Sequence, residues 1–191
     1  GAQSVYGADI PMAAMGITLK VSNVIIYIIQ GIAIGAQPII GFNYGAKNYD
    51  RTKKAFRLAV IVSAIVTFIC LAALEIFPMS IVSIFGKQSE LYNEFTVMSL
   101  RIYLMLSPLL SFQMTSAYFL QSVGKPLLST INTLTRQFFT IIPAALILSY
   151  VIGVTGVLWA GPAADGISFV ISAVIIVLCW RKIFPHCTWP L

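Results

Sequence analysis

The chain has 191 residues, of which 59% are hydrophobic and only 9% are charged, with a formal net charge of +6. A soluble domain carries about 25% charged residues, so this composition excludes a soluble protein and indicates a membrane protein. No nucleic-acid partner is expected, because the basic residues gather in loops beside apolar segments, where they orient a membrane protein.

Five apolar segments follow in chain order, each long enough to cross a bilayer core of about 30 Å, which needs about 20 helical residues. The predicted fold is therefore an all-α, polytopic transmembrane helix bundle. Pro38, Pro108, Pro143 and Pro162 lie inside four of the segments, and each is expected to kink its helix by removing a backbone hydrogen bond. The predicted spans cover residues 12–42, 55–77, 95–123, 127–150 and 154–180.

The distribution of charge predicts the orientation of the bundle. The loops at the opposite ends of the segments carry one base, Lys87, and the acids Glu90 and Glu94. Cytoplasmic loops are enriched in Lys and Arg, so the N-terminus is expected outside and the C-terminus in the cytoplasm. Eight basic residues lie at the ends of the first, third and fifth segments: Lys47, Arg51, Lys53, Lys54, Arg57, Lys125, Arg181 and Lys182.

A stripe of polar residues runs down the first segment. Asn23, Tyr27, Gln30, Gln37 and Tyr44 recur at steps of three, four or seven residues, which places them on one helix face. The stripe is interpreted either as a cavity wall with amide donors or, equally, as a set of hydrogen bonds between neighbouring helices.

The third and fourth segments repeat this pattern. Gln113 and Gln121 share a face of the third, with Tyr118 alongside, and Asn132 and Arg136 share a face of the fourth. Arg136 lies about 16 Å inside the segment at 1.5 Å per residue. A guanidinium at that depth must face protein or water rather than lipid, whether it lines a cavity or has a structural role.

Asp165 is the one acid well inside a segment, and Ser168 and Ser172 follow it on the same helix face. An intramembrane carboxylate is a functional candidate by default, here for coupling to a proton or cation. A structural ion pair with Arg136 of the preceding segment is the alternative, and it is slightly favoured.

No catalytic motif is present, because HExxH, GxSxG and P-loop patterns are all absent. The chain is therefore not expected to be an enzyme or to hold an organic cofactor. No metal site is expected either, since the three cysteines form no CxxC pair and His186 and Cys187 have no partner pair.

The most distinctive segment is QPIIGFNYGAKNYDRTKK, residues 37–54, which closes an apolar helix and turns abruptly basic. It resembles the loop after the eighth helix of multidrug and toxic compound extrusion (MATE) transporters. Other segments in the same order are similar to helices nine to twelve of that family, including Phe77-Pro78, the run 119–125, Arg136-Gln137 and the run 162–165.

The resemblance implies a partial C-terminal lobe over residues 1–191, comprising helices eight to twelve and lacking the first helix of the lobe. The chain begins Gly-Ala-Gln rather than with Met, which also favours a piece of a longer protein. Helix seven and the N-terminal lobe would then be its partners, together with the lipid bilayer.

The resemblance also implies a multi-pass protein of the plasma or inner membrane. The function implied is secondary multidrug antiport, which exports cationic or amphipathic compounds in exchange for H⁺ or Na⁺ by alternating access. Residues 95–123 contain no Asp or Glu, so the sodium site that some family members form with an acid on helix ten is not expected. Asp165 is the candidate for coupling or for a structural ion pair. The candidates to line or brace the cavity are Gln30, Gln37, Asn43, Gln113, Tyr118, Gln121, Asn132 and Arg136.

Two other functions are weighed. A flippase for lipid-linked precursors should have a strongly basic cavity to hold pyrophosphate, whereas Arg136 is the only base expected inside the bundle. A non-transporting scaffold or truncated membrane fragment is the other alternative, because alternating access requires two lobes.

Overall fold

The computed structural model describes residues 9–85 and 90–184, without the side chains of residues 154, 181 and 182. Every regular element in these ranges is helical, which confirms the prediction of an all-α bundle. Lys87, His186 and Cys187 lie outside the described residues. The helices are α1 (Asp9–Gly45), α2 (Tyr49–Ile76), α3 (Pro78–Ile84), α4 (Glu90–Leu104), α5 (Ser107–Ser122), α6 (Pro126–Leu134), the π-helix η1 (Thr135–Ile141), α7 (Ile142–Ile152) and α8 (Val154–Ile183).

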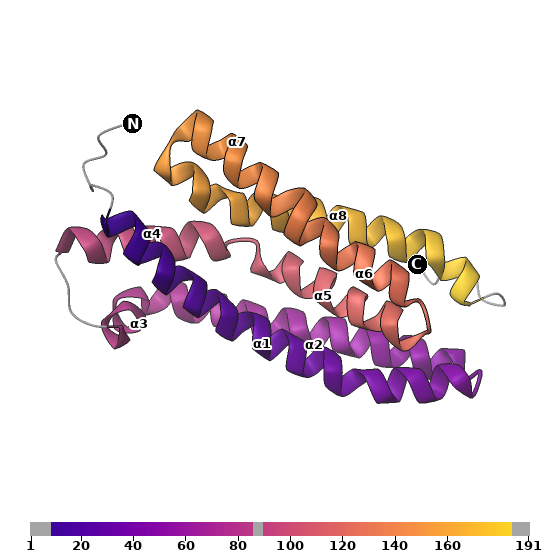
Figure 1. Ribbon diagram of the computed structural model, residues 1–191. Helices are drawn as coiled ribbons and strands as arrows, with labels where there is room; N and C mark the ends of the chain where they lie inside the picture. The colour runs from indigo at the N-terminus through magenta and orange to yellow at the C-terminus, as the bar shows by residue number, and fades with distance from the viewer. Residues whose placement is uncertain (1–8, 86–89, 185–191) are drawn as a thin grey trace.

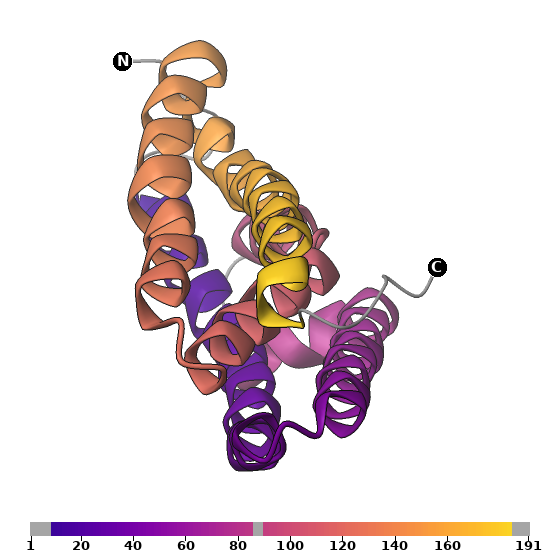
Figure 2. The same ribbon diagram turned by 90° about the vertical axis from the view of Figure 1, so that its right-hand side faces the viewer.

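The helices form two outer groups on either side of α4 and α5. Helices α1 and α2 run antiparallel along one side, and α6, η1 and α7 follow one another along α8 on the other (Figure 1). The turned view shows α2 and the α6–η1–α7 segment on opposite sides of the bundle (Figure 2). Helix α5 packs against both groups and is the element around which the site is built.

Four stretches are long and apolar enough to cross a membrane, namely α1, α2, α8 and the continuous run Pro126–Ile152. Helices α4 and α5 form a fifth candidate span only when they are taken together, because they are bent by 46° at the break between them. A 37-residue α1 measures about 55 Å at 1.5 Å per residue, so it extends well beyond the apolar core of a bilayer.

The kink predicted at Pro108 within residues 95–123 is confirmed, because the chain breaks there into α4 and α5 with a bend of 46°. Pro108 explains the position of the break, because it has no N–H and its ring collides with the carbonyl four residues earlier. That carbonyl belongs to Leu104, the last residue of α4. The short helix α3, which was not predicted, begins with Pro78 at its first position, where proline is favoured.

The other predicted kinks have different outcomes. Pro38 and Pro162 lie inside α1 and α8, which continue through them. Pro143 is the second residue of α7, directly after the π-helical η1. π-helical turns are rare and often occur at functional sites, and η1 carries Arg136.

One end of the bundle collects the basic residues that the sequence places in loops. The turns at residues 46–48 and 123–125 and the C-terminal end of α8 lie together at the right of Figure 1, away from α3 and the α7–α8 turn. The basic and acidic residues thus lie at opposite ends of the bundle, as their distribution in the sequence predicts. Which end faces the cytoplasm stays a prediction.

An aromatic cluster holds the basic end together. Phe56, Phe119 and Trp180, from α2, α5 and α8, are buried with Phe184, and the Phe56 and Phe119 ring centroids are 4.2 Å apart. The ammonium of Lys53 lies 5.1 Å from the centroid of the Phe184 ring, a cation–π contact. An aliphatic cluster of α1, α2 and α4 packs nearer the opposite end, and it includes Ile25, Ile29, Leu74, Leu100 and Leu104.

Candidate functional site

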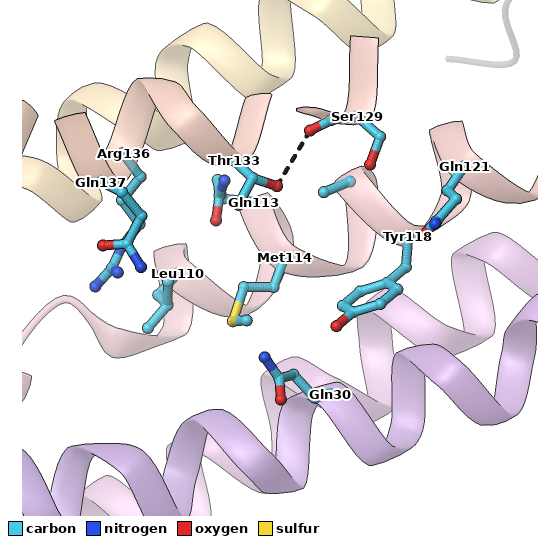
Figure 3. Close-up of a pocket in the computed structure, with 11 residues that line it drawn as sticks. Gln30, Leu110, Gln113, Met114, Tyr118, Gln121, Ser129, Thr133, Arg136 and Gln137 are labelled. Atoms are coloured by element: carbon cyan, nitrogen blue, oxygen red, sulfur yellow. Dashed lines mark hydrogen bonds between the residues drawn. The ribbon is translucent and has the colours of Figure 1, made fainter. Parts of the chain in front are cut away.

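A cavity of about 190 Å³ lies between α1, α5 and the α6–η1 segment (Figure 3). Helix α1 contributes Gln30, which points toward α5 across the opening, and Met114 and Tyr118 project from α5 into the same space. Its lining residues are Gln30, Leu110, Gln113, Met114, Ala117, Tyr118, Gln121, Ser129, Thr133, Arg136 and Gln137.

Five of the predicted site residues line this pocket: Gln30, Gln113, Tyr118, Gln121 and Arg136. Gln37 lies at its margin, where its Nε2 donates a hydrogen bond to Oε1 of Gln121 at 3.2 Å. The sequence left two equal interpretations of the polar stripe on α1. Gln30 lies on a cavity wall, and Gln37 makes a hydrogen bond to another helix, so each interpretation describes a different residue of the stripe.

Asn43 is not brought to the pocket. Its Nδ2 donates to the carbonyl of Ile39 at 2.8 Å, within α1 itself. Its own carbonyl accepts from the N–H of Asn48 at 2.8 Å and closes the turn before α2. Asn43 stabilises the end of α1 because the helix terminus leaves backbone groups that need partners.

Six lining residues were not among the predicted site residues. Three of them are on α5 and share a face with Gln113 and Gln121. The other three are on α6 and η1 and are spaced four residues apart, starting from Ser129. This spacing could be recognised in the sequence. The sequence does not distinguish a leucine, a methionine or an alanine that faces a cavity from one that faces lipid. The six are Leu110, Met114, Ala117, Ser129, Thr133 and Gln137.

The one formal charge on the lining belongs to Arg136, which is paired with Asp165 of α8. Both Nε and Nη2 of Arg136 lie 2.9 Å from Oδ1 of Asp165. The two residues are only 8% and 3% exposed, so the pair is removed from solvent and is not a surface contact. The structure thus joins the two residues for which the sequence proposed an ion pair, and it gives Asp165 no place on the lining.

Behind the pocket, a buried polar contact ties three helices together. Nε2 of Gln113 donates to the carbonyl of Asn132 at 3.0 Å, and Nδ2 of Asn132 donates to the carbonyl of Gln113 at 3.2 Å. Ser172 of α8 then donates from Oγ to Oδ1 of Asn132 at 2.5 Å. Asn132 is therefore a bracing residue that fixes α6 against α5 and α8, and Gln113 serves both the brace and the pocket wall.

A second charge pair lies away from the pocket. Nε of Arg101 is 3.0 Å from Oε2 of Glu75, and the side chains are 48% and 49% exposed.

Within residues 9–85 and 90–184, no group of three or more His, Cys, Asp or Glu side chains is placed to hold a metal ion.

The comparisons with known proteins agree with this architecture. The sequence profile of the MatE family matches residues 4–151. Two curated relatives are the multidrug export proteins MepA of Staphylococcus haemolyticus (strain JCSC1435) and of Staphylococcus aureus (strain MSSA476). The first is 24% identical over 172 residues, which cover 90% of this chain and 37% of the relative. The second is 24% identical over 174 residues, which cover 91% and 38%.

Two solved structures are similar in fold. An inward-facing multidrug resistance MATE family transporter of the MOP superfamily superposes with a TM-score of 0.81 at 16% identity, over 90% of this chain and 40% of that one. The MATE multidrug transporter DinF-BH, in complex with rhodamine 6G, superposes with a TM-score of 0.79 at 31% identity, over 91% and 38%. The chain therefore spans about two-fifths of the length of these proteins. Because the family profile covers most of its residues, the chain belongs to the MatE family of multi-pass membrane transporters.

Proposed function

We propose that this chain is a partial C-terminal lobe of a secondary multidrug antiporter, which exports cationic or amphipathic compounds in exchange for H⁺ or Na⁺ by alternating access and carries out no catalytic step. Membership of the MatE family supports this proposal, as does the fold shared with DinF-BH, a transporter described in complex with rhodamine 6G. The basic end of the bundle would face the cytoplasm, since positive residues are retained on that side.

The observation that carries the proposal is the polar pocket between α1, α5 and the α6–η1 segment. Drug-sized ligands occupy sites of about 300–1,000 Å³. At about 190 Å³ the pocket is too small for such a ligand. It would therefore form one part of a larger cavity, completed by a helix seven and an N-terminal lobe that correspond to the unmatched length of the relatives.

The buried pair of Arg136 and Asp165 is the candidate for coupling transport to an ion. A proton that binds Asp165 would remove the charge that compensates the guanidinium of Arg136, which itself lines the pocket. Proton uptake by Asp165 would then change the charge balance of a residue on the pocket wall through one contact. Residues 95–123 contain no acid, so we favour H⁺ over Na⁺ as the coupling ion of this chain.

The test is transport by the full-length protein in proteoliposomes, with a fluorescent amphipathic dye and an imposed gradient of either H⁺ or Na⁺. We expect an H⁺ gradient to drive dye movement, and we expect Asp165→Asn to abolish it when variant and wild type are compared at equal amounts of folded, reconstituted protein. Unchanged transport in Asp165→Asn would exclude an essential coupling role for this carboxylate. Failure of the wild-type protein to move any dye under either gradient would contradict the antiport proposal.

A further inference from the structure

The pocket between α1, α5 and the α6–η1 segment offers no carboxylate on its lining to a bare cation. Among its lining residues the single formal charge is positive, on Arg136, and none is an acid. The other polar groups are side-chain amides and hydroxyls, and they belong to Gln30, Gln113, Tyr118, Gln121, Ser129, Thr133 and Gln137. The amides and hydroxyls can both donate and accept hydrogen bonds, so the preference is set by Arg136, whose guanidinium only donates. A cation buried here would meet no counter-charge on the lining, whereas an anion would meet this guanidinium.

Arg136 retains donors that its ion pair does not use. Its Nε and Nη2 both approach Oδ1 of Asp165, which belongs to α8 and does not line the pocket. Its Nη1 has no partner among the described residues. A guanidinium presents five N–H donors in a planar fork that suits a carboxylate. Arg136 is thus held by one carboxylate on the α8 side and can meet a second one in the pocket.

The size of the pocket limits what such a group can carry. A cavity of about 150 Å³ accommodates a benzene molecule. At about 190 Å³ there is room for one aromatic ring with a small substituent, and Leu110, Met114 and Ala117 offer apolar surface for the ring. Methionine also makes favourable contacts with aromatic rings through its sulfur.

We infer that this pocket is a subsite for an aromatic carboxylate of the size of benzoate, as one end of a larger amphiphile, with Arg136 as its charged partner. The inference rests on the proposed transport function and narrows its substrate class to amphiphiles that carry a carboxylate, zwitterions included. In a zwitterion the cationic part lies outside this pocket, where the rest of the transporter would contact it.

Two dyes that differ in a single group test the inference on the full-length protein in nanodiscs. Rhodamine 6G is an ethyl ester with a cationic ring system, and its free acid has the same ring system and a benzoate carboxylate. Fluorescence polarisation gives the dissociation constant of each. We expect the wild-type protein to bind the free acid about tenfold more tightly, which corresponds to about 1.4 kcal/mol.

The variants assign the preference to this pocket. Arg136→Gln/Asp165→Asn removes both charges together and so avoids a buried unpaired charge, which a single substitution would create. In this double variant the ratio of the two dissociation constants should fall to about one. Arg101→Gln is the matched control, because Arg101 is also bound to a carboxylate, that of Glu75, but lies outside the pocket. It should keep the wild-type ratio.

Equal affinities in the wild-type protein would overturn the inference without any variant, so it stays testable even if the double variant does not fold. A preference for the free acid that survives in the double variant would overturn it as well. Transport of both dyes without preference would reject the subsite and leave the transport proposal intact. Failure to bind or move either dye would reject both.

Discussion

Arg136 and Asp165 are 29 residues apart in sequence, yet both Nε and Nη2 of the arginine lie 2.9 Å from one carboxylate oxygen of the aspartate. The contact joins η1 to α8 inside an apolar bundle, where either charge alone would be strongly unfavourable. Arg136 lines the pocket and Asp165 does not, so the pair connects the pocket wall with a carboxylate on α8.

Removal of the acid alone should destabilise the bundle strongly. Asp165→Ala leaves the guanidinium of Arg136 buried without a counter-charge, and we expect a loss of about 3–5 kcal/mol in the free energy of unfolding. Replacement of both residues by leucine removes the charges together and should cost far less. Unfolding of the reconstituted protein, followed by helical circular dichroism, measures both effects.

The half-exposed pair of Arg101 and Glu75 is the control for this experiment. Because solvent screens it, Glu75→Ala should change the unfolding free energy by only about 0–1 kcal/mol. Equal losses in Glu75→Ala and Asp165→Ala would show that burial of the Arg136 pair has no special energetic weight.

Asn132 should be more important for stability than its modest side chain suggests. Asn132→Ala removes the bonds to the Gln113 carbonyl and to Ser172, and we expect a loss of about 1–3 kcal/mol because buried partners are left unsatisfied. Thr133→Ala is the matched control, since Thr133 is exposed and bonds only the Ser129 carbonyl of its own helix. Thermal unfolding of the two variants side by side makes the comparison. A loss for Asn132→Ala no greater than for Thr133→Ala would contradict the bracing role.

The bend between α4 and α5 should depend on Pro108. In Pro108→Ala the new N–H can bond the Leu104 carbonyl, and the loss of the ring removes the collision that ends α4. We expect the 46° bend to decrease. Spin labels at Leu91 and Gln121, both exposed and on opposite sides of the break, should then move farther apart in pulsed electron resonance measurements. An unchanged distance would mean that packing against α8, rather than proline, sets the bend.

The basic end of the bundle should face the cytoplasm. In a background with Cys70, Cys179 and Cys187 replaced by serine, a cysteine at Lys47 should react with a membrane-impermeant thiol reagent only after the cells are opened. A cysteine at Glu90, at the other end of the bundle, should react in intact cells. The reverse pattern would mean that the predicted orientation is inverted.

Several features of this protein could be predicted from the sequence because the bilayer restricts what can cross it. A membrane span of about 20 apolar residues must form its backbone hydrogen bonds within itself, so long helices were expected. Helices α1, α2 and α8 match the predicted segments closely. The distinctive segment 37–54 and the order of the similar segments identified the family that the profile match confirms. The scarcity of intramembrane charge likewise singled out Arg136 and Asp165 as partners.

Only the tertiary structure decided which faces meet. Periodicity places Gln37, Asn43 and Gln30 along the same helix, but it does not say that Asn43 bonds its own backbone while Gln30 faces α5. Periodicity also does not distinguish Met114 or Ala117 on a pocket wall from the same residue types facing lipid, because both surroundings are apolar in a membrane. The pocket forms where α5, set at an angle to α4 by the 46° bend between them, meets α1 and the α6–η1 segment. That meeting depends on the packing of helices far apart in the chain, which a local pattern does not contain.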